Sequence, residues 1–387
     1  MDIYIDYTTV IDLENDIGKY TGAGNYTRDV IRSLTDRGIR AKILVYKGFS
    51  PLKTCEKDLM CDEVVLVETQ DLTDHVFSKG DILFLPAVTG RILKKAYRIK
   101  KKNAGLKIYA VIHDRQHNIS AFDPMDRFFY EGILSFLPAL YIRYLVKKLV
   151  YDCFYPLWIG SVDKVFTVSN HTMQALDHKS LKWITYLYQS TGYEGYDPGE
   201  GDGYDDMGDY ILFVSGGRPE KNLGRALLAF RDLCRKTKTG SRLCITGIDR
   251  EKLYRIAAHL KISRSFIDER VISYDYVDMK ELGRLYKNCR YLLFVSKGEG
   301  FGLPVLEALQ FEKTVLCSRQ SAVPEVAGSI FYYVDAFNLS SIRDGMLYLN
   351  EEKNLRYREG LAAKKKKIAN LQAELDRQVL ADEICEE

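Results

Sequence analysis

Two glutamates stand among glycines in the segment Ser296–Leu309, and their spacing suggests a site for a phosphorylated sugar. The segment reads SKGEGFGLPVLEAL, so Glu299 lies in a glycine loop and Glu307 follows eight residues later. Glycines let the backbone turn sharply and approach a ligand, and Pro304 suits the first turn of a helix. We therefore expect a helix to begin near Leu303, with Glu307 about one turn inside it.

The start of this helix is expected to bind an anion. Helix N-termini present backbone amides and the positive end of the helix dipole, and they bind diphosphates at the carboxyl edge of parallel sheets. A carboxylate is poorly suited to contact phosphate, but it accepts hydrogen bonds from sugar hydroxyls beside the phosphate. Glu299 and Glu307 could each be ordinary surface acids. Their combination with the glycines and the proline favours a sugar attached to phosphate.

A second segment, Phe213–Asn222, predicts another phosphate contact. It reads FVSGGRPEKN and places a strand, a glycine turn and the two cations Arg218 and Lys221 directly before a helical pattern. Cations beside a helix start fit the charge of a phosphate. A solvated pair of side chains that caps the helix is the alternative.

These segments resemble the E-x7-E signature and the basic loop of retaining, GT-B-fold glycosyltransferases of the large family 4. The resemblance implies an α/β GT-B fold, in which two Rossmann-like domains face an interdomain cleft. It also implies that Glu299 lies beside the donor sugar and that Glu307 binds the nucleotide ribose. Lys221 would neutralise the diphosphate, whereas Arg218 lies closer to that lysine than the family's arginine does.

The resemblance assigns further donor contacts to backbone groups. Phe301, Gly302 and Leu303 would offer backbone amides. In the first half of the chain, the segment 20–28 (YTGAGNYTR) resembles the family's first glycine loop, so Gly22 and Gly24 would close over the donor phosphates. The same glycines also resemble the start of a dinucleotide-binding motif. The third glycine of that motif is missing, however, and no acidic residue ends the following strand.

Three shorter segments also resemble family sites. His113 and Asp114 close a strand, as in the family's histidine-aspartate site on the acceptor side. His113 could therefore position the donor sugar or the incoming hydroxyl, or it could be a hydrogen-bonded structural residue. Asn170 in the segment VSNH could be a helix cap or a ligand. The segment PEVAG at 324–328 resembles the family's late motif, whereas 310–314 (QFEKT) lacks the glycine and proline that usually follow the second acid.

Alternating strand and helix patterns predict two β/α sheets separated by a linker. Strands are expected at 3–7, 41–46, 64–67, 82–85, 108–112 and 164–168, and then at 210–215, 242–246, 271–273 and 291–295. Helices are expected at 25–34, 222–236 and 278–288. The predicted domains are an acceptor-side domain (1–190), an acidic, glycine-rich linker (191–209), a nucleotide-sugar domain (210–350) and a helical tail across both (351–387).

Composition narrows the class of protein. The chain has 387 residues, 46% hydrophobic and 28% charged, and no run of about eighteen uncharged apolar residues that would span a membrane. Its start reads as a strand rather than an export signal, and its eight cysteines are scattered, so we expect a cytoplasmic protein without structural zinc. A net charge of +3 does not indicate nucleic-acid binding. The basic stretches 91–107 and 141–158 could contact anionic lipid at the inner face of the membrane, although a core-facing helix is the alternative for the second.

The expected reaction moves a hexose-type sugar from a nucleoside diphosphate sugar to a hydroxyl of a saccharide or lipid-linked saccharide. Lys221 and the helix amides would stabilise the departing nucleoside diphosphate, with no cofactor or metal. Lys221, Glu299 and His113 are the expected catalytic residues. The resemblance implies retention of configuration and suggests surface-polysaccharide biosynthesis. The alternatives are an epimerase or hydrolase of sugar nucleotides on the same fold, and a non-catalytic binding scaffold.

Overall fold

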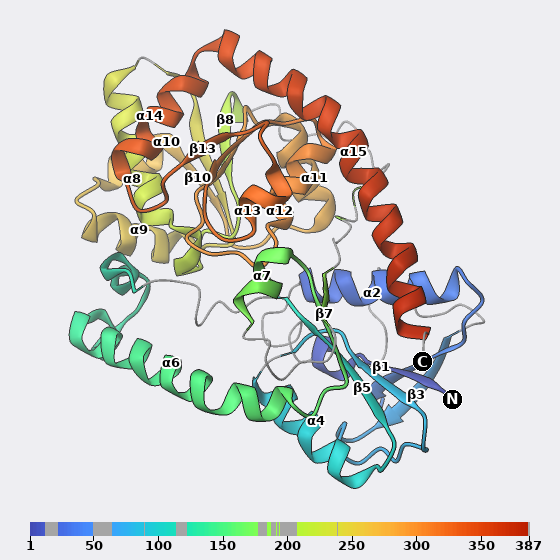
Figure 1. Ribbon diagram of the computed structural model, residues 1–387. Helices are drawn as coiled ribbons and strands as arrows, with labels where there is room; N and C mark the ends of the chain where they lie inside the picture. Colours follow the sequence, from blue (N-terminus) through green and yellow to red (C-terminus); the bar gives the residue numbers. More distant parts are fainter. Residues whose placement is uncertain are drawn as a thin grey trace. The chain divides into compact units, whose positions relative to one another are not determined.

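The computed structural model describes residues 1–11, 22–48, 64–88, 90–113, 122–176, 184–186, 191, 193, 207–237 and 239–385. The chain divides into two compact units (Figure 1). The first unit contains Met1–Arg115, Lys148–Ser190 and Leu371–Glu387, and the second contains Gln116–Lys147 and Thr191–Asn370.

The first unit is built on a parallel sheet of seven strands in the order β3-β2-β1-β4-β5-β6-β7. The central strands are almost wholly buried, as expected when helices cover both faces of a parallel sheet. Leu83, Leu93 and Ile108 belong to its core. The strands are β1 (Ile3–Asp6), β2 (Ala41–Tyr46), β3 (Val64–Thr69), β4 (Ile82–Leu85), β5 (Lys107–Ile112), β6 (Lys164–Thr167) and β7 (Ile184–Tyr186), and the helices include α2 (Gly22–Thr35), α4 (Gly90–Lys102) and α7 (Asn170–Ala175).

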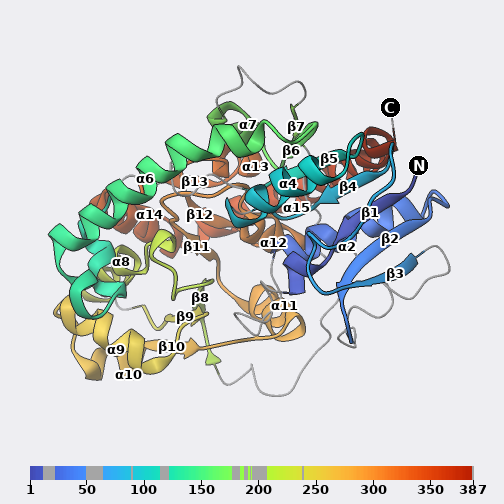
Figure 2. The ribbon, with the colours of Figure 1, turned by 90° about the horizontal axis from the view of Figure 1, so that it is seen from below.

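The second unit is built on a parallel sheet of six strands in the order β10-β9-β8-β11-β12-β13. The strands are β8 (Tyr210–Phe213), β9 (Arg242–Thr246), β10 (Val271–Tyr274), β11 (Leu292–Phe294), β12 (Val315–Ser318) and β13 (Tyr332–Val334). Helices α8 (Leu223–Lys236) and α14 (Leu339–Asn350) pack side by side, and Phe230 and Met346 join one core (Figure 2). Its other helices include α9 (Arg250–His259), α10 (Arg264–Arg270), α11 (Met279–Asn288), α12 (Leu303–Gln310) and α13 (Val323–Ala327), with a short helical turn η4 (Pro219–Lys221).

The strand order reverses once in each sheet. In the first sheet the reversal lies between β1 and β4, and in the second it lies between β8 and β11. Loops that leave the carboxyl ends of the two strands at such a reversal diverge, and ligands of open α/β sheets bind there. The topology therefore points to the loops after β8 and β11 in the second unit, which are the two loops that contain Lys221 and Glu299.

The predicted strands and helices are confirmed, with ends that coincide or are shifted by up to three residues. The predicted acceptor-side domain differs from the first compact unit in one stretch. The stretch with η1 (Pro124–Phe129), η2 (Gly132–Ser135) and the start of α6 (Leu137–Ile159) precedes the predicted linker but belongs to the second unit. The physical reason is that polar and aromatic side chains of η1 contact α8 and α9, for example Phe128 stacked on His259.

The predicted tail forms one helix, α15 (Glu352–Cys385), whose residues up to Asn370 belong to the second unit and whose later residues belong to the first. In the first unit Arg37 pairs with Asp382, and in the second Arg358 donates to the carbonyl of Ile330 across 2.7 Å. Most of the predicted linker 191–209 lies outside the described residues. Among the helices that the structure describes, none combines the length and apolar character needed to cross a bilayer.

Candidate functional site

Lys221 and Glu299 meet at the strand reversal of the second sheet. β8 and β11 are adjacent and parallel, so the loops that follow them leave the same edge. Lys221 Nζ donates to Glu299 Oε1 across 2.6 Å, although 78 residues separate the two along the chain. Both side chains are buried, with Lys221 5% and Glu299 8% exposed, and the ammonium lies 5.1 Å from the centroid of the Phe294 ring. Two residues that were predicted from separate motifs therefore form one charged pair.

Direct hydrogen bonds fasten the two loops to each other. The amide of Lys297 donates to the carbonyl of Glu220 at 2.8 Å, and Ser296 Oγ donates to the same carbonyl at 3.0 Å. Asn222 adopts a left-handed conformation with φ of 70°, and its Nδ2 donates to the carbonyls of Val295 and Ala336. Asparagine tolerates this backbone region better than most residues. The position of Lys221 relative to Glu299 is thus held by backbone as well as by side chains.

The glycines of the basic loop serve close packing. A side chain on Gly217 would place its Cβ 2.4 Å from the carbonyl oxygen of Gly247, and one on Gly216 would lie 2.5 Å from Ile245 Cγ2. Real Cβ atoms do not approach backbone so closely, so only glycine fits at 217. The glycine turn that the sequence predicts as a phosphate contact therefore also lets the loops after β8 and β9 pack against each other.

The glutamate segment folds as its sequence predicts. α12 begins at Leu303, with Pro304 in its first turn, and the preceding Gly302 has φ of 109°, which favours glycine. Phe301 is buried beside this turn. Glu307 lies one turn inside the helix, as expected.

Glu307 is held by a tyrosine from the neighbouring helix. The hydroxyl of Tyr286 on α11 donates to Glu307 Oε2 across 2.6 Å. Burial and the nearby carboxylate raise the pKa of Tyr286 well above its usual value, so the phenol keeps its proton. Glu307 itself is only partly buried. One of its oxygens is thus oriented by a fixed donor.

Arg218, the other cation predicted in this loop, pairs with a neighbouring acid. Its side chain is half exposed, and its Nη2 lies 2.5 Å from Glu220 Oε1. Burial raises the pKa of Glu220, but the Arg218 guanidinium and the Lys221 ammonium outweigh that effect and lower it overall. The structure therefore brings Arg218 to Glu220, and its role as a donor contact stays a prediction.

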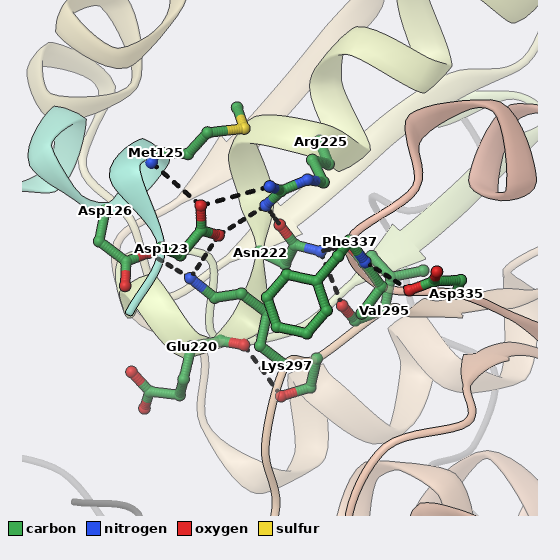
Figure 3. A network of polar contacts seen from close by, with 12 residues as sticks. Asp123, Met125, Asp126, Glu220, Asn222, Arg225, Val295, Lys297, Asp335 and Phe337 are labelled. Atoms are coloured by element: carbon green, nitrogen blue, oxygen red, sulfur yellow. Dashed lines mark hydrogen bonds and ion pairs between the residues drawn. The ribbon is translucent and has the colours of Figure 1, made fainter. Parts of the chain in front are cut away.

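A buried network of charges lies beside the glutamate loop, and the sequence did not predict it (Figure 3). Asp123 lies between Lys297 and Arg225: Lys297 Nζ is 3.0 Å from Asp123 Oδ2, and Arg225 donates to both carboxylate oxygens at 2.6 and 3.2 Å. Lys297, which is 3% exposed, also pairs with Asp126. Lys297 stands two residues before Glu299, so the network anchors the loop that contains the predicted catalytic acid.

The two aspartates of this network have opposite pKa shifts. Burial raises the pKa of Asp123, but hydrogen bonds from Arg225 and the charge of Lys297 outweigh it and lower the value to about 2. For Asp126, burial dominates over the attraction of Lys297 and raises the pKa to about 6. Asp123 is therefore ionised at neutral pH. Asp126, with its pKa of about 6, gains or loses its proton about one pH unit below neutral.

A weak sequence signal exists for one member of the network. Asp123 followed by Pro124 is a typical start of a helical turn, and the Asp123 side chain does accept from the amide of Met125 at 3.1 Å. Nothing in the spacing indicates Lys297 as its partner, because the two residues are 174 positions apart.

In the first unit His113 lies at the end of β5, next to β4. Its Nε2 is 2.7 Å from the carbonyl oxygen of Pro86, and its ring packs edge-on against Tyr26 with centroids 5.1 Å apart. Burial lowers the pKa of His113 to about 4, although the Pro86 carbonyl acts in the opposite direction. The imidazole is thus neutral at physiological pH and Nε2 is its protonated nitrogen. Asp114 lies outside the described residues.

Gly22 and Gly24 lie in the first turn of α2, which begins at Gly22, three residues earlier than expected. The preceding part of the predicted glycine loop is outside the described residues. Asn170 is the first residue of α7 rather than its cap. Ser169 caps this helix, because its extended backbone lets its hydroxyl accept from the amide of Thr172 at 3.1 Å.

A cavity of about 560 Å³ opens in the second unit, and neither Lys221 nor Glu299 is among its lining residues. It is lined by Arg319, Pro324, Ser329, Phe331, Tyr332, Tyr333 and Arg358. Within the described part of the chain, no three His, Cys, Asp or Glu side chains gather where they could hold a metal ion. Metal independence stays a prediction.

A sequence family matches the second unit, and two relatives match parts of the chain. Residues 202–366 match the family Glycosyl transferases group 1. O-antigen chain mannosyltransferase B of Escherichia coli is 28% identical over 136 residues, which are 34% of this chain and 34% of that protein. Serotype-specific mannosyltransferase WbdA of Escherichia coli is 35% identical over 95 residues, 24% of this chain and 11% of WbdA. The chain thus spans about a third of the first relative and about a tenth of the second.

Solved structures resemble the chain over nearly its whole length. A structure of the trehalose-6-phosphate synthase OtsA has a TM-score of 0.69 at 9% identity and covers 100% of this chain and 99% of its own. A glycosyltransferase from Rickettsia africae has a TM-score of 0.64 at 14% identity, with 100% and 99% covered. At such low sequence identity, the likeness to these structures shows the fold alone. The chain therefore has the GT-B fold, with one Rossmann-like sheet in each unit, and residues 202–366 match the family Glycosyl transferases group 1.

Proposed function

We propose that this chain is a retaining glycosyltransferase of family 4 that moves a hexose from a nucleoside diphosphate sugar to a hydroxyl of a saccharide or lipid-linked saccharide. The observation that carries the proposal is the contact between Lys221 Nζ and Glu299 Oε1 at the strand reversal between β8 and β11. The family match over this unit supports a transferase, and the E-x7-E spacing of Glu299 and Glu307 supports the subfamily.

Lys221 has the charge and the placement to receive a diphosphate. Its ammonium is buried against Phe294 and paired with a carboxylate, so a diphosphate that enters beside it would compete with Glu299 for the same protons. Release of one Glu299 oxygen from the lysine would leave that carboxylate to accept hydrogen bonds from sugar hydroxyls. When the donor binds, Lys221 would contact its diphosphate and Glu299 would contact its sugar, and the two residues would no longer bond only to each other.

In the proposed reaction the bond between the anomeric carbon and the diphosphate oxygen breaks, and a bond from the acceptor oxygen to that carbon forms on the same face. The nucleoside diphosphate departs with the bonding electrons, and the acceptor's proton passes to a departing phosphate oxygen. Lys221 and the amides at the start of α12, among them those of Phe301, Gly302 and Leu303, stabilise the charge that develops on the leaving group. This countercharge comes from the protein, so no metal is required.

The remaining predicted residues take supporting roles in this proposal. Glu307, oriented by Tyr286, binds the nucleotide ribose, and Gly22 and Gly24 approach the donor phosphates from the first unit. The neutral His113 positions a hydroxyl by hydrogen bonding and does not act as a cation, because its pKa is about 4. The mannosyltransferase names of the relatives, one of them tied to an O-antigen chain, support a hexose donor and a role in surface-polysaccharide assembly.

The test is a transfer assay with the intact chain. Uridine and guanosine diphosphate sugars that contain glucose or mannose are incubated with saccharide acceptors, with and without a chelator, and products are identified by mass spectrometry. We expect one donor to yield an acceptor extended by one hexose, with or without the chelator and with the donor's anomeric configuration by NMR. An altered or hydrolysed donor without any acceptor would instead indicate an epimerase or hydrolase, and donor binding without turnover would indicate a scaffold.

A further inference from the structure

The cavity of about 560 Å³ in the second unit lies at the β13 edge of the sheet, and arginine and aromatic side chains line it. Arg319 follows β12, Tyr332 and Tyr333 belong to β13, and Arg358 comes from α15. All of them belong to the second unit, so we call this space the 319–358 cavity and describe it within that unit alone. Its volume falls within the range of about 300–1,000 Å³ that is typical of sites for small molecules.

The lining of the 319–358 cavity is positively charged. Two of its seven residues are arginines and none is acidic. Within the part of the chain that the structure describes, no carboxylate forms an ion pair with Arg319 or Arg358. Arg225 and Arg290 of the same unit are, by contrast, paired with aspartates. The two cations at the cavity therefore keep their charge available for an anion.

A third cation lies next to the wall of the cavity. Lys365 follows Arg358 by seven residues on α15, and at about 100° of rotation per residue the two fall on the same side of the helix. Its Nζ lies 3.7 Å from the place that a Cβ on Gly328 would take. The carbonyl of Gly328 accepts a hydrogen bond from the hydroxyl of Tyr333, which lines the cavity. Lys365 thus adds positive charge beside the two arginines.

Arg358 is oriented by backbone carbonyls and has donors left over. Its Nη1 donates to the carbonyls of Ile330 and Phe331 at 2.7 and 3.3 Å. Its Nε is buried and has no acceptor among the described residues. Nε and Nη2 form one edge of the guanidinium, and two parallel N–H groups of this kind match two oxygens of a phosphate. A buried donor without an acceptor costs free energy, so an oxyanion at this edge would be stabilising.

Aromatic rings form the apolar part of the lining. Tyr332 stacks on Tyr348 of α14 with centroids 4.5 Å apart, and Phe331 is buried. The guanidinium of Arg319 lies 5.6 Å from the centroid of the Tyr333 ring. A bare phosphate ion would leave these rings uncovered, whereas an organic phosphate would bring its own apolar surface against them.

The cavity adjoins the glutamate loop but shares no lining residue with the Lys221–Glu299 pair. Ser318, next to Arg319, donates from its Oγ to the carbonyl of Ser296 at 2.6 Å. The amide of Ala322 donates to the carbonyl of Glu299 at 3.4 Å. The segment that forms one wall of the cavity is thus hydrogen-bonded to the loop of the candidate site.

We propose that the 319–358 cavity binds an organic phosphate monoester, with the phosphate at Arg319 and Arg358 and the organic ring against Tyr332 and Tyr333. A phosphate monoester has a charge of about −1.5 to −2 at neutral pH and three strong acceptor oxygens, which suits two guanidiniums with an ammonium nearby. This ligand is separate from the sugar donor, whose diphosphate is assigned to Lys221. Binding at the cavity therefore does not depend on the proposed transferase activity.

The test is calorimetry with the intact chain, without any nucleotide sugar. Glucose 6-phosphate represents a sugar ring and phenyl phosphate an aromatic ring, and glucose, phenol and inorganic phosphate are the reference compounds. We expect at least one of the two monoesters to bind more tightly than all three reference compounds, and the tighter monoester identifies the kind of ring. No binding of either monoester would overturn the proposal, and so would equal binding of the unphosphorylated compounds or of inorganic phosphate.

Two variants locate the binding site. Arg319→Gln removes a charge-assisted hydrogen bond and should weaken binding about tenfold or more. Ser329→Glu places a negative charge in the lining and should weaken binding at least as much. Both side chains are exposed, so the fold should be retained, which circular dichroism verifies.

Two matched substitutions serve as controls. Arg235→Gln changes an exposed arginine at the end of α8, and Ser265→Glu changes an exposed serine on α10, which packs against β10 at the opposite edge of the sheet. Both controls should bind the monoester like the parent chain. Equal affinities of Arg319→Gln, Ser329→Glu and the controls would overturn the assignment of the site.

The Lys221 site is the competing position for a phosphate. Lys221→Ala should keep its affinity for the monoester, whereas Arg319→Gln should lose it. The reverse pattern would place the phosphate at the donor site and would overturn the proposal. Failure of the transfer assay would leave this result unaffected, because no donor is present in the titration.

Discussion

Lys221 Nζ and Glu299 Oε1 lie 2.6 Å apart in a buried position, and each residue comes from the loop after one of the two strands at which the sheet order reverses. This pair joins a predicted phosphate contact to a predicted sugar contact. It also means that neither residue can be changed without an effect on the other, because the loss of one partner leaves a buried charge uncompensated.

Substitution of Lys221 should impair catalysis. Lys221→Ala removes one stabilising cation, and by analogy with the loss of an oxyanion donor we expect a loss of about 2.7–4 kcal/mol in transition-state stabilisation, measured as kcat/KM. Lys221→Arg keeps the charge and should retain more activity. Lys236→Ala, at the exposed end of α8, is the control. Wild-type turnover of a folded Lys221→Ala variant would show that the lysine has no part in the reaction.

Substitution of Glu307 should weaken nucleotide binding more than chemistry. Glu307→Ala removes an acceptor for the ribose hydroxyls, and a hydrogen bond to a charged group contributes about 1.5–3 kcal/mol, or roughly ten-fold or more in affinity. Calorimetry with the nucleoside diphosphate alone measures the change. Tyr286→Phe keeps the carboxylate and removes only its orienting hydrogen bond, so its effect should be smaller. Unchanged affinity of the alanine variant would contradict the assignment.

Removal of Asp123 should destabilise the second unit. Asp123→Ala deprives the buried Lys297 and Arg225 of their shared partner, and breaking a buried pair costs about 3–5 kcal/mol. Denaturant unfolding, followed by a probe in the second unit, measures the loss. Asp268 forms an exposed pair with Arg250, so Asp268→Ala is the control and should change stability little. Equal effects of the two substitutions would argue against a structural role for the network.

Asp126 should make stability depend on pH. Its pKa is about 6 in the folded chain, against an ordinary 3.8, so between these values the folded state holds a proton that the unfolded state has lost. Stability should therefore fall as pH rises from about 4 to about 6. Asp126→Asn removes this pH-dependent contribution. The unfolding free energy of the variant, relative to that of the parent chain, should therefore rise as pH increases from about 4 to about 6. A difference that stays constant with pH would show that Asp126 has an ordinary pKa.

Gly217 should not tolerate a side chain. Gly217→Ala would place a methyl group 2.4 Å from the carbonyl oxygen of Gly247, and such overpacking typically costs about 1–3 kcal/mol. Gly240 has open space around the same position, so Gly240→Ala is the matched control. Thermal unfolding compares the two. A Gly217→Ala variant as stable as the control would mean that the loops after β8 and β9 can separate.

Several features of the site follow from local sequence. Gly302, Pro304 and the apolar pattern after them predict a helix that begins at Leu303, because glycine allows a positive φ and proline suits the first turn. The alternation of apolar strands and helices predicts two parallel sheets. Both predictions succeed because each pattern depends only on a residue and its near neighbours. The pair of Arg218 with Glu220 is also local, because the two residues are two positions apart.

The sequence by itself determined the order of strands and helices and the two motifs that contain Lys221 and Glu299. Tertiary structure alone decided the 2.6 Å contact between them and the cluster of Asp123 with Lys297 and Arg225. The physical reason is that periodicity and turn chemistry act over a few residues. Pairing of buried charges and burial of a helix face depend instead on which distant segments the sheet topology brings together.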